Sequence, residues 1–130
     1  MIDLDEIRRK TVSVDEYVSA VNSSFREKFL ARKQSYQLTE KAVNELKRVA
    51  DKYTVVVFSA EWCKDCANHI PVLELVSKAT GLEVRVFGHI RKDPLSTKEK
   101  WRIPPSPPEV KTFGVEKLPW IIILDKKGRE

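Results

Sequence analysis

Residues 53–66 of this chain read YTVVVFSAEWCKDC, and the rest of the fold can be worked out from this stretch. Residues 53–59 are almost all β-branched or aromatic, which is typical of a central strand buried on both faces. From Cys63 to about residue 79 the spacing becomes helical, and Gly81 then supplies a helix-ending signal. The two cysteines, Cys63 and Cys66, therefore stand where a buried strand passes into a helix.

The following residues extend this strand and helix into a larger α/β unit. Residues 82–87 predict a second strand, and a strand, a helix and a strand in about 35 residues form a βαβ unit with parallel strands. Residues 119–124 predict a third strand, and DKKG at residues 125–128 is a turn signal. Residues 103–109, IPPSPPE, contain four prolines and predict a loop.

The first part of the chain has a helical pattern instead. Ser13 opens a capping box, and apolar residues at intervals of three and four then predict one amphipathic helix to about Ala31. Thr39 begins a second predicted helix. We expect residues 1–52 to form a helical hairpin, an N-terminal extension that packs on a core of residues 53–130 within a single structural domain.

Composition and charge argue against secreted, membrane-spanning and nucleic-acid-binding classes of protein. A chain of 130 residues with 42% hydrophobic residues can bury a core without staples, and its net charge of +5 is far from that of a dedicated nucleic-acid-binding protein. The N-terminus lacks the apolar stretch of a secretory signal, and the longest strongly apolar run, residues 118–124, is only 7 residues long. We therefore expect a soluble, cytoplasmic protein without a membrane or nucleic-acid partner.

The cysteines are too close together to be the staple of a disulfide-rich secreted domain. A cysteine at the start of a helix meets free backbone N–H groups and the positive end of the helix dipole, and both favour the thiolate. Cys63 is therefore the predicted nucleophile. Cys66, one turn further along, is placed to attack a mixed disulfide formed at Cys63 and to release the reduced product.

Several residues around the cysteines resemble the thioredoxin superfamily. Residues 58–63, FSAEWC, resemble that family's passage from strand to active site, and Pro71 stands where members often have a proline in the active-site helix. Residues 114–119, GVEKLP, resemble its approach to a cis-proline. The resemblance covers about residues 53–130 and implies a thioredoxin-like three-layer sandwich, most similar to members with a helical N-terminal extension and a WCxxC motif.

The resemblance also implies an activity and a substrate site. It implies thiol–disulfide exchange by Cys63 and Cys66, whose own redox-active disulfide serves in place of a bound cofactor. It implies a cis bond between Leu118 and Pro119 that lies against the cysteines and presents the backbone of Leu118 to an extended substrate. In the cytoplasm such a protein acts as a reductant; its substrate is a disulfide-bearing protein or a small thiol with which it exchanges. It takes electrons from an external donor, which is a thioredoxin-reductase-like protein or a small thiol.

Two tryptophans flank these residues in the sequence. Trp62 precedes Cys63 and Trp120 follows Pro119, so both are candidates to line a substrate groove. For Trp120 the alternative is a packed strand residue.

Two departures from the family pattern concern charge. Val57 stands where thioredoxins commonly bury an acid, so Glu61, Asp65 or a water must take the proton of the resolving thiol. Lys64 and Asp65 lie between the cysteines; Lys64 favours the Cys63 thiolate, Asp65 opposes ionisation, and solvent screens both effects at an exposed site.

The third departure concerns the ends of the chain. The helical hairpin takes the place of the family's first strand, and the last strand and closing helix have no counterpart, so we expect an incomplete C-terminal hairpin. An open hydrophobic edge is rarely left bare. We expect the N-terminal segment to cover the strand at residues 119–124, or a second copy to pair with it in a homodimer, unless the sequence is a shortened form.

Three other interpretations are open. Cys63, Cys66, His69 and His89 add up to four possible zinc ligands, but their spacing differs from the common zinc sites, and we predict no metal. Residues 85–102 carry six basic and two acidic side chains, which predicts a solvated face or a surface for an acidic partner. The competing function is a binding or adaptor module with the same fold and weak or no redox activity.

Overall fold

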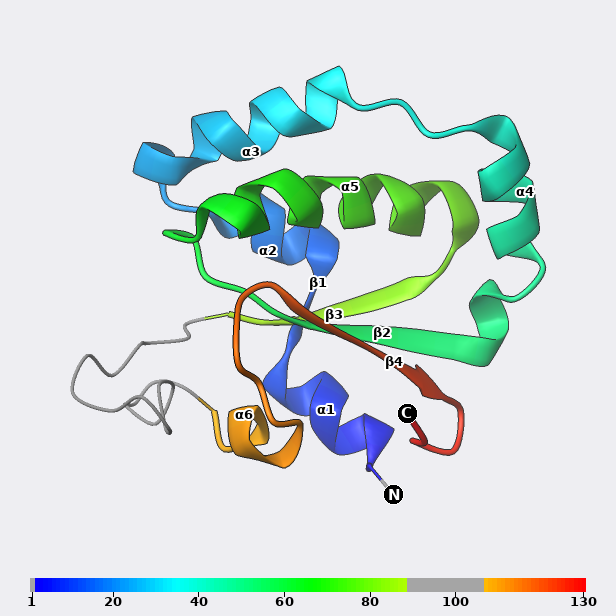
Figure 1. The fold of residues 1–130 in the computed structure, drawn as a ribbon. Coiled ribbons are helices and arrows are strands. Elements are labelled where there is room, and N and C mark those ends of the chain that lie inside the picture. The colour runs from blue at the N-terminus through cyan, green and yellow to red at the C-terminus, as the bar shows by residue number, and fades with distance from the viewer. Residues whose placement is uncertain (1, 89–106) are drawn as a thin grey trace.

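In the computed structural model, residues 2–88 and 107–130 are described, and they form one mixed sheet with helices on both faces (Figure 1). The helices are α1 (Leu4–Lys10), α2 (Val14–Ala20), α3 (Ser23–Ser35), α4 (Glu40–Lys47), α5 (Lys64–Thr80) and α6 (Glu109–Thr112), with a 3-10 turn at Ala50–Lys52. The strands are β1 (Val12–Ser13), β2 (Tyr53–Phe58), β3 (Glu83–Phe87) and β4 (Trp120–Asp125). The strand, helix and strand predicted around the cysteines are β2, α5 and β3.

The described strands lie in the order β1-β3-β2-β4. β2 and β3 are parallel, which confirms the predicted βαβ unit, and β4 is antiparallel to β2. β1 pairs antiparallel with β3 through Val12 and Ser13. The expectation that helices replace the first strand is therefore wrong, because β1 exists but has only 2 residues, too few to show a period in the sequence.

The molecule has the three layers that the resemblance implies. In Figure 1, α2, α3 and α5 lie above the sheet, and α1 and α6 lie below it. Thr54 shares the lower face with Glu83, which pairs with Arg8 of α1, so the alternating Val55 and Val57 point toward α5. β2 is accordingly buried from its second residue to its last, as its composition predicts.

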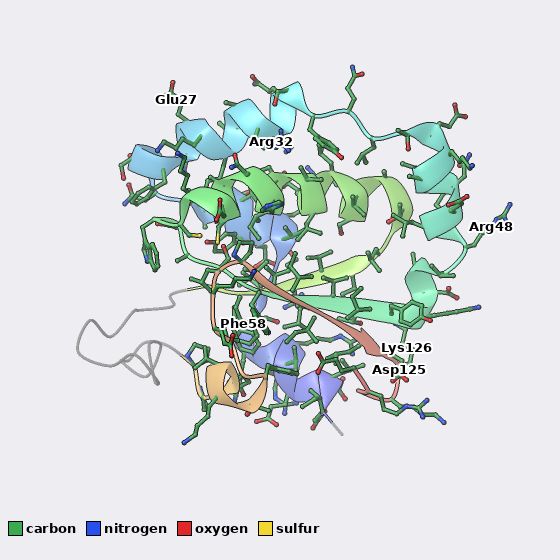
Figure 2. All side chains as sticks on the ribbon, viewed as in Figure 1. Glu27, Arg32, Arg48, Phe58, Asp125 and Lys126 are labelled. Carbon is green, nitrogen blue, oxygen red and sulfur yellow. The ribbon has the colours of Figure 1, made fainter. Side chains whose placement is uncertain are left out.

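The core fills both sides of β2. Phe29 of α3 and Ile70 of α5 are fully buried above the sheet. Phe58 lies in the interior at the end of β2, where its ring stacks on Phe87 with centroids 4.8 Å apart, whereas Glu27 extends into solvent (Figure 2). Burying an apolar side chain of this size stabilises the folded state by about 1.5–3 kcal/mol, so this packing holds the end of β2 in place.

The single helix predicted from Ser13 to about Ala31 is wrong, because two helices occupy that stretch. α2 ends at Ala20, and Val21 is extended with φ −57° and ψ 133°. The Asn22 side chain then caps α3 by accepting the backbone N–H of Ser24. Asn bonds to nearby backbone groups in non-helical conformations, which favours a cap over a continuous helix.

The N-terminal segment is therefore a series of helices and not a two-helix hairpin. α4 begins after the predicted cap, Thr39, and lies at the opposite end of α5 from the start of α3 (Figure 1). α1 was not predicted; it is capped by Asp3, whose carboxylate accepts the backbone N–H groups of Asp5 and Glu6. The division of the chain into residues 1–52 and 53–130 stays a prediction.

β4 is the outer strand on its side of the described sheet. Ile121 and Ile123 are 47% and 54% exposed on the α5 side, beyond the reach of that helix. The N-terminal segment does not cover this edge, because α1 lies on the opposite face and Ile2 reaches only Gly128, past the end of the strand (Figure 1). Pairing with a second copy stays a prediction.

A buried ion pair joins α3 to α5. Glu74 lies on α5 with its side chain only 3% exposed, and Lys33 Nζ of α3 approaches Glu74 Oε1 at 2.8 Å. Lys78, one turn further along α5, is 3.8 Å from the other carboxylate oxygen. A buried carboxylate without a partner is costly, so the position of α3 depends on Lys33.

Replacing Lys33 by Met is expected to lower the free energy of unfolding by about 2 kcal/mol, because Glu74 would lose its nearest cation. Lys28→Met, on the exposed side of the same helix, is the control and should change stability by less than about 0.5 kcal/mol. Urea denaturation of both variants measures the difference. Equal stabilities would show that α3 is held by apolar packing alone.

Candidate active site

The active-site helix α5 begins at Cys63. This residue is its N-cap, with φ −80° and ψ 117°, and the cysteine sulfur accepts the backbone N–H of Cys66 at 3.3 Å. The backbone between Phe58 and Cys63 leaves the buried end of β2 and turns into the helix. The sulfur thus takes the position of a capping oxygen, where a free backbone donor and the helix dipole both favour a negative charge.

A second segment, 55 residues later, closes over Cys63. The Cys63 thiol donates to the backbone carbonyl of Leu118 at 3.6 Å. The peptide bond between Leu118 and Pro119 is cis, as the resemblance implies. The predicted catalytic pair and the predicted cis-proline are therefore brought together by the fold.

The two thiols differ in their surroundings. Both are free; Cys63 is 9% exposed and Cys66 is fully buried. Burial first, and the neighbouring Cys63 second, raise the pKa of the Cys66 thiol to about 12, although the Ser59 hydroxyl and the Ala60 backbone act to lower it. Cys63 is thus the outer thiol, and Cys66 is the inner thiol that stays protonated at neutral pH.

Two of the predicted substrate-groove residues adjoin the outer thiol, one by contact and one by sequence, whereas Trp120 packs against the hydrophobic core. Trp62 is 51% exposed beside Cys63. Leu118 is buried, whereas Pro119 and Trp120 are half-buried. An exposed indole next to a nucleophilic sulfur provides a flat apolar surface for a ligand.

The charged residues that were predicted to act on the thiols are either exposed to solvent or hydrogen-bonded to another segment. Lys64 and Asp65 are exposed, so solvent screens their effect on the thiols. The Glu61 carboxylate accepts the backbone N–H of Asn22 at 3.0 Å, which links the active-site turn to the start of α3. Val57 is fully buried, and the position of the family's acid is therefore filled by core packing.

Two polar residues near the inner thiol were not predicted as site residues. The hydroxyls of Tyr17 and Ser59 lie 3.0 Å apart in the interior, and Ser59 also interacts with Cys66. Burial raises the pKa of Tyr17, so this phenol stays protonated. In the sequence only Ser59 stands out, because it is a polar residue directly after an apolar strand. Tyr17 fits the apolar spacing of its predicted helix and gives no sign of a site.

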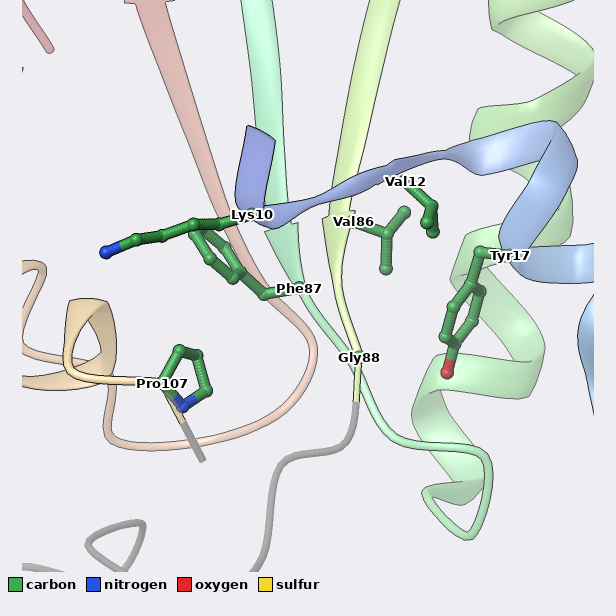
Figure 3. A pocket seen from close by; sticks show the side chains of 7 residues that line it. All are labelled: Lys10, Val12, Tyr17, Val86, Phe87, Gly88 and Pro107. Carbon is green, nitrogen blue, oxygen red and sulfur yellow. The ribbon is translucent and has the colours of Figure 1, made fainter. Parts of the chain in front are cut away.

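Tyr17 also lines a cavity of about 200 Å³ (Figure 3). It is lined by Lys10, Val12, Tyr17, Val86, Phe87, Gly88 and Pro107. Neither cysteine lines it, so it is separate from the candidate active site.

The remaining predictions fall partly outside the described residues. His89, most of the basic segment 85–102 and most of the proline segment 103–109 lie there. Within residues 2–88 and 107–130, no three His, Cys, Asp or Glu side chains are grouped as a metal site would require, and His69 is exposed on α5. No helix in the same ranges is long and apolar enough to cross a membrane.

Comparison with known proteins agrees with this fold. A structure of a protein of unknown function from Pseudomonas aeruginosa is 15% identical, with a TM-score of 0.71 over 99% of this chain and 74% of that one. An HIV epitope-scaffold is likewise 15% identical, with a TM-score of 0.71 over 98% and 73% of the two chains. At this identity the two structures are evidence for the fold alone. No curated protein sequence matches the chain.

The family itself is shown by sequence. A family model described as thioredoxin matches residues 11–130, which includes both cysteines, the cis-proline and nearly all of the N-terminal helices. Because this match extends over almost the whole chain, the protein belongs to the thioredoxin family.

Proposed function

We propose that this protein is a thiol–disulfide oxidoreductase in which Cys63 attacks the substrate and Cys66 resolves the intermediate. The observation that carries the proposal is the asymmetry of the two thiols. Cys63 caps α5, accepts a backbone N–H and adjoins the exposed Trp62, whereas Cys66 is fully buried one turn behind it. An outer nucleophile backed by an inner thiol is the arrangement that a two-step exchange requires.

The reaction proceeds through two thiolate attacks. The Cys63 thiolate attacks one sulfur of a substrate disulfide and expels the other as a thiolate, which leaves a mixed disulfide. Cys66 then loses its proton and attacks Cys63 Sγ; the Cys63–Cys66 disulfide forms, and the second substrate sulfur leaves and takes up a proton. An external dithiol or a small thiol returns two electrons to this disulfide.

The substrate backbone would be held by the segment around the cis-proline. In the mixed disulfide Cys63 has no proton to donate, so the Leu118 carbonyl that it contacts at 3.6 Å is available to a backbone N–H of the substrate. Trp62 and Pro119 supply apolar surface beside this carbonyl. These features favour a disulfide-bearing protein as substrate and, in a cytoplasmic setting, a reductant role.

The activity is tested by an insulin-type disulfide reduction assay with dithiothreitol as the donor. Cys63→Ser should abolish the catalysed rate because the attacking sulfur is lost. Cys66→Ser should also lower turnover to background, but it should accumulate a mixed disulfide that mass spectrometry detects. Since the chain has only 2 cysteines, any trapped adduct of Cys66→Ser must be on Cys63.

Wild-type protein that gives no turnover above the Cys63→Ser control would refute the enzyme. The protein would then be a binding or adaptor module with the same fold, and the presence of Val57 in place of a buried acid would explain its lack of redox activity.

The rate of the second step should rise with pH well beyond neutrality. Burial, the largest cause of the raised pKa of Cys66, is still present in the mixed disulfide, so this thiol is protonated at pH 7 and its thiolate fraction grows about tenfold per pH unit below its pKa. Ellman's reagent separates the steps: Cys63 releases the first nitrothiobenzoate, and resolution by Cys66 releases the second. The second-phase rate should climb without a plateau from about pH 7 to about pH 9, whereas a plateau near the ordinary thiol pKa of about 8.5 would contradict the burial of Cys66.

A further inference from the structure

Three buried groups form a row that leads from α2 to the inner thiol. Tyr17 of α2 and Ser59, directly after β2, bring their hydroxyl oxygens to 3.0 Å, and the Ser59 hydroxyl acts on Cys66 of α5 by lowering the pKa of its thiol. Tyr17 is 8% exposed, and Ser59 and Cys66 are fully buried. Gly88 gives the Tyr17 ring its room, because a Cβ at that position would stand 3.0 Å from a ring carbon (Figure 3).

Because Cys66 is fully buried, its thiolate needs hydrogen-bond donors during the resolving step. Val57 provides no charge or proton acceptor, and Glu61 is bonded to the backbone of Asn22. A buried anion without hydrogen bonds is costly, and a bond to a charged group is among the stronger ones. The donors that act on the Cys66 sulfur are the Ser59 hydroxyl and the backbone of the next residue, so Ser59 is the side chain able to support the thiolate.

The hydroxyl of Ser59 has one hydrogen, which it can donate either to Tyr17 or to the Cys66 sulfur. If that hydrogen pointed to Tyr17, none would remain for the sulfur. Burial raises the pKa of Tyr17, so its phenol keeps a proton to donate. With Tyr17 donating to Ser59 Oγ, the Ser59 hydrogen is free to point to Cys66.

We propose that Tyr17 and Ser59 are positioning residues for the resolving step: Tyr17 orients the Ser59 hydroxyl, and this hydroxyl donates to the Cys66 thiolate as it forms. The inference rests on the proposed oxidoreductase function. In this step the Cys66 S–H bond breaks, the Cys63–Cys66 bond forms, and the bond from Cys63 to the substrate sulfur breaks. The electron pair leaves with the substrate sulfur, which is protonated at the expense of Cys66 through solvent, so no further oxidant or reductant is needed.

The N-terminal helices thereby acquire a role in the chemistry. α2 packs on α5 and supplies the phenol that completes the row. The hydroxyl pair supports the thiolate by donating a hydrogen bond, which differs from the role of a buried acid as proton acceptor.

The test uses both phases of the reaction with Ellman's reagent in the full chain. Ser59→Ala should slow the second phase about tenfold, and Tyr17→Phe should slow it by about three- to tenfold. The first phase, which reports Cys63, should stay within about twofold. The double variant should be no slower than Ser59→Ala, because Tyr17 acts through Ser59.

Matched controls remove one hydroxyl each, away from the site. Ser77→Ala deletes a bond to the Leu82 carbonyl further along α5, and Tyr53→Phe alters a 39% exposed phenol at the start of β2. Neither should change the second phase. The double variant distinguishes positioning from general damage, because two independent defects would multiply whereas two parts of one chain of hydrogen bonds do not. The slowing by Ser59→Ala should appear in the pH profile as a second-phase line moved about one unit to higher pH with its slope unchanged. Besides Cys66, the titratable groups that act on this row are Cys63, Tyr17 and Glu61.

The outcomes separate the two proposals. A wild-type protein without a Cys66-dependent second phase would refute the oxidoreductase itself. A wild-type protein with both phases, but with an unchanged second phase in Ser59→Ala, would overturn only the role of the hydroxyls. If Ser59→Ala does not fold, Tyr17→Phe, which keeps the ring, decides alone: a normal second phase overturns the inference.

Discussion

Strand β2 is paired on both edges and packed on both faces, and the segment that carries Ser59 and Cys63 begins directly after its last residue. Phe58 is held by its stacking on Phe87, the next residue is Ser59, and four residues later Cys63 caps α5. A strand with this much contact has little freedom to shift. The sulfur of Cys63 and the hydroxyl of Ser59 are therefore fixed by the same core, the first in contact with Leu118 and the second with Tyr17.

At this site hydrogen bonds and burial, more than charged side chains, determine which sulfur can carry a negative charge. The outer sulfur has a backbone N–H and the end of a helix dipole, both of which support an anion. The inner sulfur is buried and its donors are neutral, so the Cys66 thiol keeps its proton until the resolving step. The exposed Lys64 and Asp65 contribute little against this background because water screens them.

The fold was predictable where the pattern in the sequence is long. β2, α5, β3, β4 and α4 follow from hydrophobic spacing, caps and turn residues that act locally. β1 was missed because two residues carry no period, and the break at Val21 was missed because the apolar spacing continues across it. The break lies where Asn22 both caps α3 and bonds to Glu61, and the second of these contacts is tertiary.

The sequence by itself determined that two cysteines follow a buried strand at the start of a helix, and that Leu118 and Pro119 resemble the approach to a cis-proline. Those facts depend on neighbours along the chain. Tertiary structure alone decided that Leu118 meets Cys63, that Cys66 is the buried thiol, and that Tyr17 reaches Ser59 across 42 residues. Such contacts depend on how helices pack on the sheet, and a hydroxyl on an apolar helix face does not reveal its partner until that packing is known.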